Sequence, residues 1–346
     1  MHTVLIDLLQ VSLGTRDSLS RVPSDVEWVS LMEEAKRQAV LGVMMSGLER
    51  VSEQVVVPEE VMVKWFGRVQ KTERRYALHC ARSRELTALF GEAGFRCCVL
   101  KGLGFAQLYP IPARRQLGDI DLWVAGETSD VLRFLQASYP LEKVVWHHAD
   151  AKVFEDVETE IHYHPGWFYN PFRNRRLQQW YDRERDAQMV PDSGLGFAWP
   201  STRFNAVHSL VHLLHHMMEE GIGVRHLVDY FYIVKALGAD ERSAVVSDLN
   251  RLGLGRLAGA MMWVLQEVCG MPSSELLCAP NEREGRFLLD EVLRGGNFGH
   301  HRHDNRRRNS FARTFALLPH YPSEVLWMFP WKVWHWFWRK RHGAVA

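Results

Sequence analysis

Two aspartates separated by one residue, Asp119 and Asp121, are the residues of this sequence best placed to do chemistry together. They lie in the run DIDLWV, whose alternation of polar and apolar residues predicts a half-buried strand. Residues two apart on a strand point to the same face, with Cα atoms about 6.5 to 7 Å apart. Two carboxylates held in this way can share one or two divalent cations, and their hard oxygen atoms suit Mg²⁺. An exposed strand with two aspartates is also common without any catalytic role.

A third carboxylate, Glu160, follows on a separate predicted strand over residues 157–164. The alternation of this strand places Glu158, Glu160, His162 and His164 on one face. The sequence therefore offers acidic side chains on two strands that could belong to one sheet.

The predicted secondary structure that must position these carboxylates changes from helix to strand near residue 95. Residues 1 to about 95 show apolar residues at helical spacing, including one helix that begins at Ser24 and a long run from Val61 to Gly91. The short apolar run RCCVLKG then predicts a buried strand that ends in glycine. A helical piece, LGFAQLYP, and a loop, IPARRQLG, lead to the strand with the two aspartates.

Beyond that strand we expect a helix over residues 129–138 and an antiparallel ribbon with strands at 143–148, 151–154 and 157–164. From about residue 200 the sequence is periodic and helical again. This order predicts an α+β fold, with a mixed sheet flanked by N-terminal helices and a C-terminal helical domain. The expected domains are residues 1–94, 95–190 and 191–346.

A glycine-containing turn from strand to helix, an aspartate pair and a later acidic strand follow the order seen in the nucleotidyltransferase superfamily typified by DNA polymerase β. More specifically, the chain resembles a bacterial family described as uncharacterised nucleotidyltransferases. The resemblance rests on LKGLGFAQLYPIPARRQLGDIDLWV at 100–124 and ETEIHYH at 158–164, and on a His-rich helix followed by VRHLVDYFYIV. One departure is Lys101-Gly102, where the superfamily usually has Gly-Gly or Gly-Ser.

The resemblance implies a metal site. Asp119 and Asp121 would bind two Mg²⁺ ions that bridge the nucleotide phosphates. Glu160 would complete the site or act as the base for an acceptor hydroxyl, and Glu158 is the second choice for that role.

The resemblance also implies a nucleotide site. Gly102 would let backbone amides approach the triphosphate. Lys101 and Arg115 would neutralise its charge, although either could equally be a solvated or structural base. His162 would line the nucleotide cleft, because it shares a face with Glu160.

The implied reaction is Mg²⁺-dependent transfer of a nucleoside monophosphate from an NTP, such as ATP, to an unidentified acceptor with release of pyrophosphate. A small molecule is the first choice of acceptor, and a protein or peptide is the second. Two rival interpretations are a non-catalytic nucleotide-binding or regulatory protein that retains the fold, and a metal-dependent hydrolase that uses the His-rich helix.

Histidines form the other candidate sites. His208, His212 and His215 share one helical face, but no HExxH motif accompanies them, which favours a core-facing or substrate-facing role. In the latter case His212 or His215 would line the cleft together with Arg225 and Asp229.

A zinc site is a further alternative on the ribbon. It would combine His162 and His164, beside Glu160, with His147 and His148. The nucleotide-lining role of His162 is the preferred interpretation.

Composition limits the binding partners and the cellular location that we expect for this protein. A net charge of +1 over 346 residues gives no global attraction for long nucleic acid. Five cysteines without a CxxC motif indicate reduced thiols, and there is no signal peptide or membrane span, so a cytoplasmic protein is expected. The basic run at 300–308 suits either a solvated loop or an anionic ligand. The Trp-rich C-terminal segment either packs on the helical domain or makes peripheral contact with a membrane.

Overall fold

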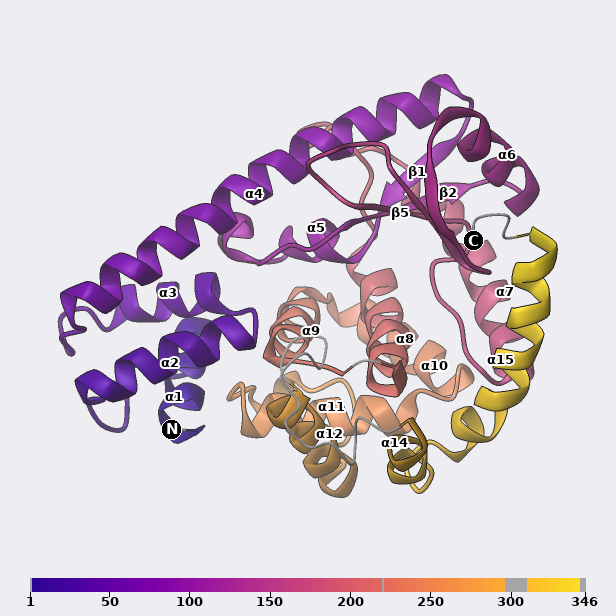
Figure 1. Cartoon of the computed structure of the whole chain (residues 1–346). Helices are drawn as coiled ribbons and strands as arrows, with labels where there is room; N and C mark the ends of the chain where they lie inside the picture. The colour runs from indigo at the N-terminus through magenta and orange to yellow at the C-terminus, as the bar shows by residue number, and fades with distance from the viewer. Residues whose placement is uncertain (1, 220, 296–309, 343–346) are drawn as a thin grey trace. The chain divides into compact units, whose positions relative to one another are not determined.

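The computed structural model describes residues 2–219, 221–295 and 310–342 (Figure 1). The folded chain divides into two compact units, each built from three segments. The first unit comprises Met1–Tyr76, Leu108–Gln116 and His216–Asn309, and the second comprises Ala77–Gln107, Leu117–His215 and Ser310–Ala346. The division into domains at residues 94/95 and 190/191 stays a prediction.

The first unit is helical in its described part. Its helices are α1 (His2–Leu13), α2 (Asp25–Arg37), α3 (Leu41–Arg50), α9 (Val224–Ala236), α10 (Ala239–Arg251), α11 (Gly255–Glu267) and α12 (Glu282–Gly295), with short turns η1 (Pro112–Arg114) and η2 (Ser273–Glu275). Residues 25–50 were expected to form one helix, but they form two. Ala39 adopts a positive φ of 56°, a left-handed conformation that ends the first helix.

The second unit contains a five-stranded mixed sheet with the order β1-β2-β5-β4-β3. The strands are β1 (Arg96–Val99), β2 (Ile120–Ala125), β3 (Leu141–Val144), β4 (His148–Ala151) and β5 (Thr159–His162). Strands β2 and β5 run parallel, and the other neighbouring pairs are antiparallel. The predicted α+β fold with a mixed sheet is confirmed.

The antiparallel ribbon is also confirmed, but its first strand, predicted at 143–148, is β3 at Leu141–Val144, and its middle strand is shifted as well. That strand was predicted at 151–154, whereas β4 covers His148–Ala151. The backbone N–H of Val153 donates to the carbonyl of Ala151, so the chain turns out of the sheet immediately after β4. The shift places His148, not His147, opposite His162 in the sheet.

The described part of the second unit also contains helices. They are α5 (Lys101–Ala106), α6 (Thr128–Ser138), α7 (Pro171–Gln188), α14 (Ser310–Leu317) and α15 (Pro322–His342). The long helices α4 (Glu59–Glu92) and α8 (Thr202–Glu219) contribute residues to both units. Trp123 of β2 stacks on Phe204 of α8, with ring centroids 5.6 Å apart, and Phe204 stacks on Trp180 of α7. These buried rings anchor α7 and α8 on the face of β2 that also carries Asp121.

The Trp-rich C-terminal segment forms helix α15, and one face of this helix packs onto the second unit. Trp331 stacks on Trp167 with ring centroids 3.9 Å apart, while the Trp146 backbone N–H contacts His335 Nε2. No helix of the described residues is long and apolar enough to cross a membrane. The basic run at 300–308 lies outside the described residues.

Candidate functional site

Three carboxylates converge at the point where β2 and β5 lie side by side. Asp121 of β2 is directly opposite Glu160 of β5 in the parallel register. Asp119 is the loop residue immediately before β2. One oxygen from each of these three side chains lies within 4.8 Å of the others. The sequence-based expectation that the aspartate pair and Glu160 are neighbours therefore agrees with this geometry. Glu158 is exposed and outside the group, and its carbonyl oxygen accepts a hydrogen bond from Ile120.

Two basic side chains contact the buried Asp121. Lys101 Nζ forms an ion pair with Asp121 Oδ1, and the Nε2 of His162 donates to the same oxygen over 2.9 Å. His162 Nε2 also lies 3.2 Å from Glu160 Oε2, so one N–H is shared by two carboxylates. The backbone N–H of Leu100 donates to the Asp121 carbonyl, which holds the turn with Lys101 against β2.

The backbone at Lys101 is unusual. Its φ of 46° is in the left-handed region, which favours glycine. The departure from a Gly-Gly or Gly-Ser turn thus puts a lysine where a glycine would be unstrained, at a cost of about 1–2 kcal/mol. This backbone conformation accompanies a direct contact between the ammonium group of Lys101 and the carboxylate cluster.

Electrostatics indicates an excess of negative charge in this cluster. Burial and the negative charges of Asp121 and Glu160 raise the pKa of Asp119 to about 7. Burial opposes ionisation of Asp121 as well, but the charge of Lys101 and the hydrogen bond from His162 hold the pKa of Asp121 below its ordinary value. Because Lys101 and His162 leave Asp119 under strong repulsion, the cluster suits a divalent cation, and its hard oxygen donors suit Mg²⁺.

A second group of metal-type donors lies beside the carboxylates. His148, Glu160 and His162 each offer one ligand atom within 4.8 Å of the others. Of the two further histidines in the zinc alternative, His164 stacks on Trp146 and neither it nor His147 belongs to this group. The zinc alternative named all three members of this group, and it also named His147 and His164, which lie outside it.

Arg115 belongs to the first unit, where it forms a buried ion pair with Asp229. Its Nε and Nη2 donate to the two carboxylate oxygens, each over 2.7 Å, and the Tyr109 hydroxyl donates to Oδ1 over 2.5 Å. Burial would raise the pKa of Asp229, but the guanidinium of Arg115 keeps it below its ordinary value. Arg225 lies in the same unit, and its Nη1 donates to the carbonyl of Gln116.

The histidines of α8 lie among aromatic side chains. His208 Nδ1 and the Tyr181 hydroxyl share a 2.9 Å hydrogen bond, and burial lowers the pKa of His208 to about 3. The ring of His215 contacts Trp167 with centroids 4.6 Å apart. Neither group of metal-type donors found among the described residues includes these histidines.

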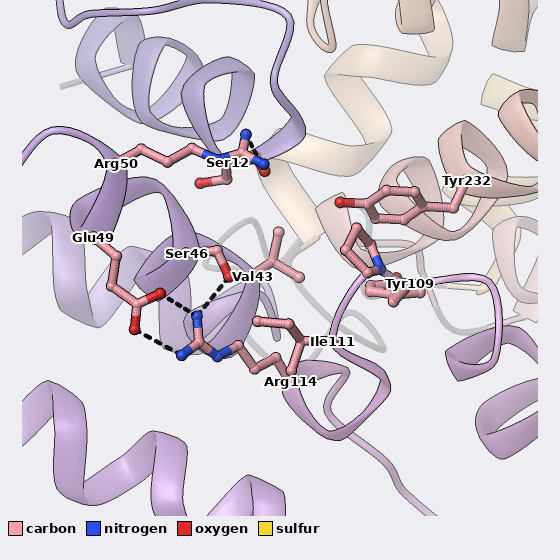
Figure 2. Close-up of a pocket in the computed structure, with 10 residues that line it drawn as sticks. Ser12, Val43, Ser46, Glu49, Arg50, Tyr109, Ile111, Arg114 and Tyr232 are labelled. Atoms are coloured by element: carbon pink, nitrogen blue, oxygen red, sulfur yellow. Dashed lines mark hydrogen bonds and ion pairs between the residues drawn. The ribbon is translucent and has the colours of Figure 1, made fainter.

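The first unit also contains a cavity of about 290 Å³ (Figure 2). It lies between α1, α3, α9 and the segment 109–114, and its lining residues are Ser12, Val43, Ser46, Glu49, Arg50, Tyr109, Pro110, Ile111, Arg114 and Tyr232. Its basic groups already have partners: Arg114 donates to Ser46 and Glu49, and Arg50 donates to the carbonyls of Val11 and Ser12. We therefore assign no ligand to this cavity.

Sequence reasoning missed Asp150, which lies opposite Glu160 on β4. Its Oδ1 is 2.8 Å from His148 Nε2. The signal was present in the alternation of His148 and Asp150, but the strand was predicted three residues too late. With β4 at 148–151, antiparallel pairing brings both side chains to the face of Glu160 and His162.

Comparisons with known proteins assign the chain to a family. Residues 24–270 match the family described as uncharacterised nucleotidyltransferase. No curated protein matches the chain. Among solved structures, an antigenic nucleotidyltransferase-like protein from Paracoccidioides brasiliensis is 15% identical, over 58% of this chain and 93% of that chain, with a TM-score of 0.35. A likeness this weak supports no argument, whereas the family match covers most of the sequence and includes all three carboxylates. The chain belongs to the family of uncharacterised nucleotidyltransferases.

Proposed function

We propose that this protein is a Mg²⁺-dependent nucleotidyltransferase, which transfers a nucleoside monophosphate from an NTP to an acceptor. The observation that carries the proposal is the convergence of Asp119, Asp121 and Glu160, whose oxygens lie within 4.8 Å of one another. Family membership supports the class of reaction. Lys101 and His162 contact Asp121 and Glu160, but the pKa of Asp119 is still raised by the neighbouring negative charges, and a bound divalent cation would relieve that repulsion.

In this proposal Asp119, Asp121 and Glu160 hold two Mg²⁺ ions. Bound Mg²⁺ would supply neutralisation of phosphate charge and a template for the reactants. An acceptor oxygen attacks the α-phosphorus, the bond from that phosphorus to the bridging oxygen breaks, and pyrophosphate leaves. Glu160 either completes the metal site or accepts the proton of the acceptor hydroxyl.

The remaining residues would bind the nucleotide. Lys101 would neutralise triphosphate charge, and Gly102 would leave room for phosphate oxygens near its backbone N–H. His162 would line the cleft beside Glu160. Arg115 stays a candidate for phosphate binding as well as a partner of Asp229.

A small-molecule acceptor remains the first choice and a protein or peptide the second. The test uses the full chain with Mg²⁺ and each α-labelled NTP, first with a pool of small metabolites and then with a protein fraction. We expect release of pyrophosphate and an equal amount of label in one of the two pools.

Two other outcomes would count against the proposal. Mg²⁺-dependent NTP binding without pyrophosphate release would favour the regulatory rival. Metal-dependent hydrolysis that needs no nucleotide would favour the hydrolase rival.

Lys101→Met should weaken NTP binding by about tenfold to a hundredfold, because a charge-assisted contact to phosphate is worth roughly 1.5–3 kcal/mol. Affinity for Mg²⁺ alone should not fall, since Lys101 competes with cations for Asp121. Isothermal titration calorimetry measures both. Lys152→Met, a change at a half-exposed lysine, is the control, and equal NTP affinity in the two variants would remove Lys101 from the site.

We also propose that α15 contacts the surface of an anionic membrane. Five of its exposed apolar side chains recur at helical spacing on one face: Leu326, Phe329, Val333, Trp336 and Phe337. Arg339, Lys340 and Arg341 follow in the last turn, and the Lys340 ammonium lies 3.8 Å from the centre of the Trp336 ring. Aromatic rings next to basic groups suit the interface of an anionic bilayer.

A double change, Trp336→Ser with Phe337→Ser, should reduce binding to vesicles of phosphatidylserine and phosphatidylcholine by at least about tenfold, because insertion of either ring is worth more than about 1.4 kcal/mol. Sedimentation measures the bound fraction, and Phe66→Ser, an exposed apolar residue on α4, is the control. Binding that is equal in all three proteins would contradict the proposal. Self-association without vesicles would assign the face to a second copy of the chain.

A further inference from the structure

The face of the sheet that carries the carboxylate cluster also carries donors of a different chemistry. We propose that His148, Glu160 and His162 bind a Zn²⁺ ion in a second metal site next to the Asp119–Asp121 site. This inference goes beyond nucleotidyl transfer and does not depend on it. It rests on the convergence of the donors, on a buried His148 ring whose nitrogens make no hydrogen bond among the described residues, and on the position of a fourth side chain.

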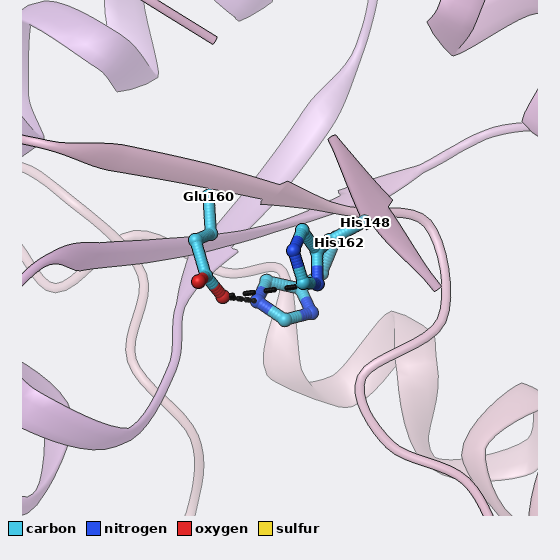
Figure 3. A group of neighbouring side chains, drawn as sticks. All are labelled: His148, Glu160 and His162. Carbon is cyan, nitrogen blue, oxygen red and sulfur yellow. Dashed lines mark hydrogen bonds and ion pairs between the residues drawn. The ribbon is translucent and has the colours of Figure 1, made fainter. Parts of the chain in front are cut away.

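The two imidazole rings turn a nitrogen toward the same carboxylate oxygen (Figure 3). His162 Nε2 lies 3.2 Å from Glu160 Oε2, and His148 Nδ1 lies 3.8 Å from it. The sheet fixes this arrangement, because His148 of β4 is directly opposite His162 of β5 and Glu160 precedes His162 by two residues. Three adjacent donors from two paired strands thus face one point without rearrangement of the backbone.

The burial of His148 points to a ligand. This side chain is 5% exposed, and within the described residues neither of its ring nitrogens makes a hydrogen bond. A buried polar atom without a partner costs about 1–3 kcal/mol, and such atoms are rare in folded proteins. His148 Nδ1 is aimed at Glu160, where a bound cation would satisfy it.

Asp150 supplies the support that a metal-binding histidine usually has. Its Oδ1 is 2.8 Å from His148 Nε2, a close contact that falls short of hydrogen-bond geometry. Histidine ligands commonly turn their second nitrogen to a carboxylate, which fixes the tautomer and the ring orientation. With a proton on Nε2 facing Asp150, His148 presents an unprotonated Nδ1 to the metal.

The chemical types of the three donor atoms favour one kind of metal over another. Imidazole nitrogen together with one carboxylate suits Zn²⁺, whereas Mg²⁺ prefers oxygen ligands. Three protein ligands leave the fourth position of a zinc tetrahedron for water or a substrate oxygen. Binding displaces the proton that His162 Nε2 shares between Asp121 and Glu160. Because Glu160 belongs to both donor groups, it would be the residue that links the two metal sites.

The first test uses the full chain, stripped of metal with EDTA and dialysed. Titration with ZnCl₂ should load one zinc per chain, measured by calorimetry and by elemental analysis after a second dialysis. X-ray absorption at the zinc edge should then show two imidazole ligands and one carboxylate. No retained zinc, or a coordination shell rich in sulfur, would overturn the assignment.

Variants locate the ion. His148→Gln should lose the bound zinc with an unchanged circular dichroism spectrum, while His164→Gln, at the histidine stacked on Trp146, should retain it. Replacing His300, His301 and His303 together by serine should also leave the zinc content unchanged. Retention by His148→Gln, or loss in either control, would place the zinc elsewhere.

Asp119→Asn separates this inference from the proposed function. That variant should lose nucleotidyl transfer and keep its zinc, since Asp119 belongs only to the carboxylate group. If the wild-type chain binds zinc but transfers no nucleotide, the zinc site stands and the proposed function fails. If it transfers nucleotide and binds no zinc, the reverse holds.

Discussion

Asp121→Asn is expected to abolish nucleotidyl transfer, with a loss of turnover of about 10³-fold or more. Asp121 is central in the proposed metal site, because it lies opposite Glu160 and two residues from Asp119. Replacing one charged ligand removes electrostatic stabilisation of the transition state worth several kcal/mol, and each 1.36 kcal/mol is a factor of ten in rate. Pyrophosphate release under saturating NTP and Mg²⁺ measures the effect.

The Asp121→Asn chain should stay folded. The substitution leaves Lys101 among two other carboxylates and relieves the repulsion that raises the pKa of Asp119. Circular dichroism and thermal unfolding check this. Glu158→Gln is the matched control, because it removes an exposed carboxylate two residues from Glu160 and outside the cluster. Near-normal turnover in Asp121→Asn, or an equal loss in Glu158→Gln, would contradict our assignment.

Asp229→Ala should lower the free energy of unfolding by about 3–5 kcal/mol. The change leaves the buried guanidinium of Arg115 without the two carboxylate oxygens of Asp229 and removes the acceptor of the Tyr109 hydroxyl. Breaking a buried ion pair on one side has this large cost because an uncompensated charge stays buried. Urea denaturation measures it. Glu49→Ala is the control: its carboxylate is half exposed and pairs with Arg114, so we expect less than about 1 kcal/mol.

The same ion pair separates the two roles of Arg115. If Arg115 binds the triphosphate, Arg115→Lys should weaken NTP binding by about tenfold, since lysine cannot reproduce a bidentate contact. If Arg115 only pairs with Asp229, the free energy of unfolding of Arg115→Lys should fall while its NTP affinity is unchanged. If neither quantity changes, the bidentate guanidinium contact is needed for neither role, and a lysine ammonium at this position is sufficient.

The local sequence was enough to predict several elements. The alternation in DIDLWV correctly predicted β2, and the helical periodicity after Pro58 correctly predicted α4. Prediction was weaker where the chain turns. Ala39 breaks a continuous helical pattern through a positive φ, and no glycine or proline announces it. The strand around His148 was misplaced, because a short apolar and polar alternation fits more than one register.

Side-chain partners were less predictable than elements. Nothing in the sequence indicated that Lys101, whose backbone is left-handed, pairs with Asp121. Nor could it show that Arg115, four residues before Asp119, makes its close contacts with Asp229, which is 114 residues further along the chain.

The sequence by itself determined the types of chemical group in this protein and the strands that carry them, because side chains two apart on a strand must share a face. Only the tertiary structure decided which groups meet. Strand order places β5 between β2 and β4, so Glu160 has Asp121 on one side and Asp150 on the other, with His148 and His162 nearby. Contacts of that kind depend on which strands pair in the sheet. Strand pairing is decided by interactions between residues that are far apart in the sequence, so a short stretch of sequence does not predict it.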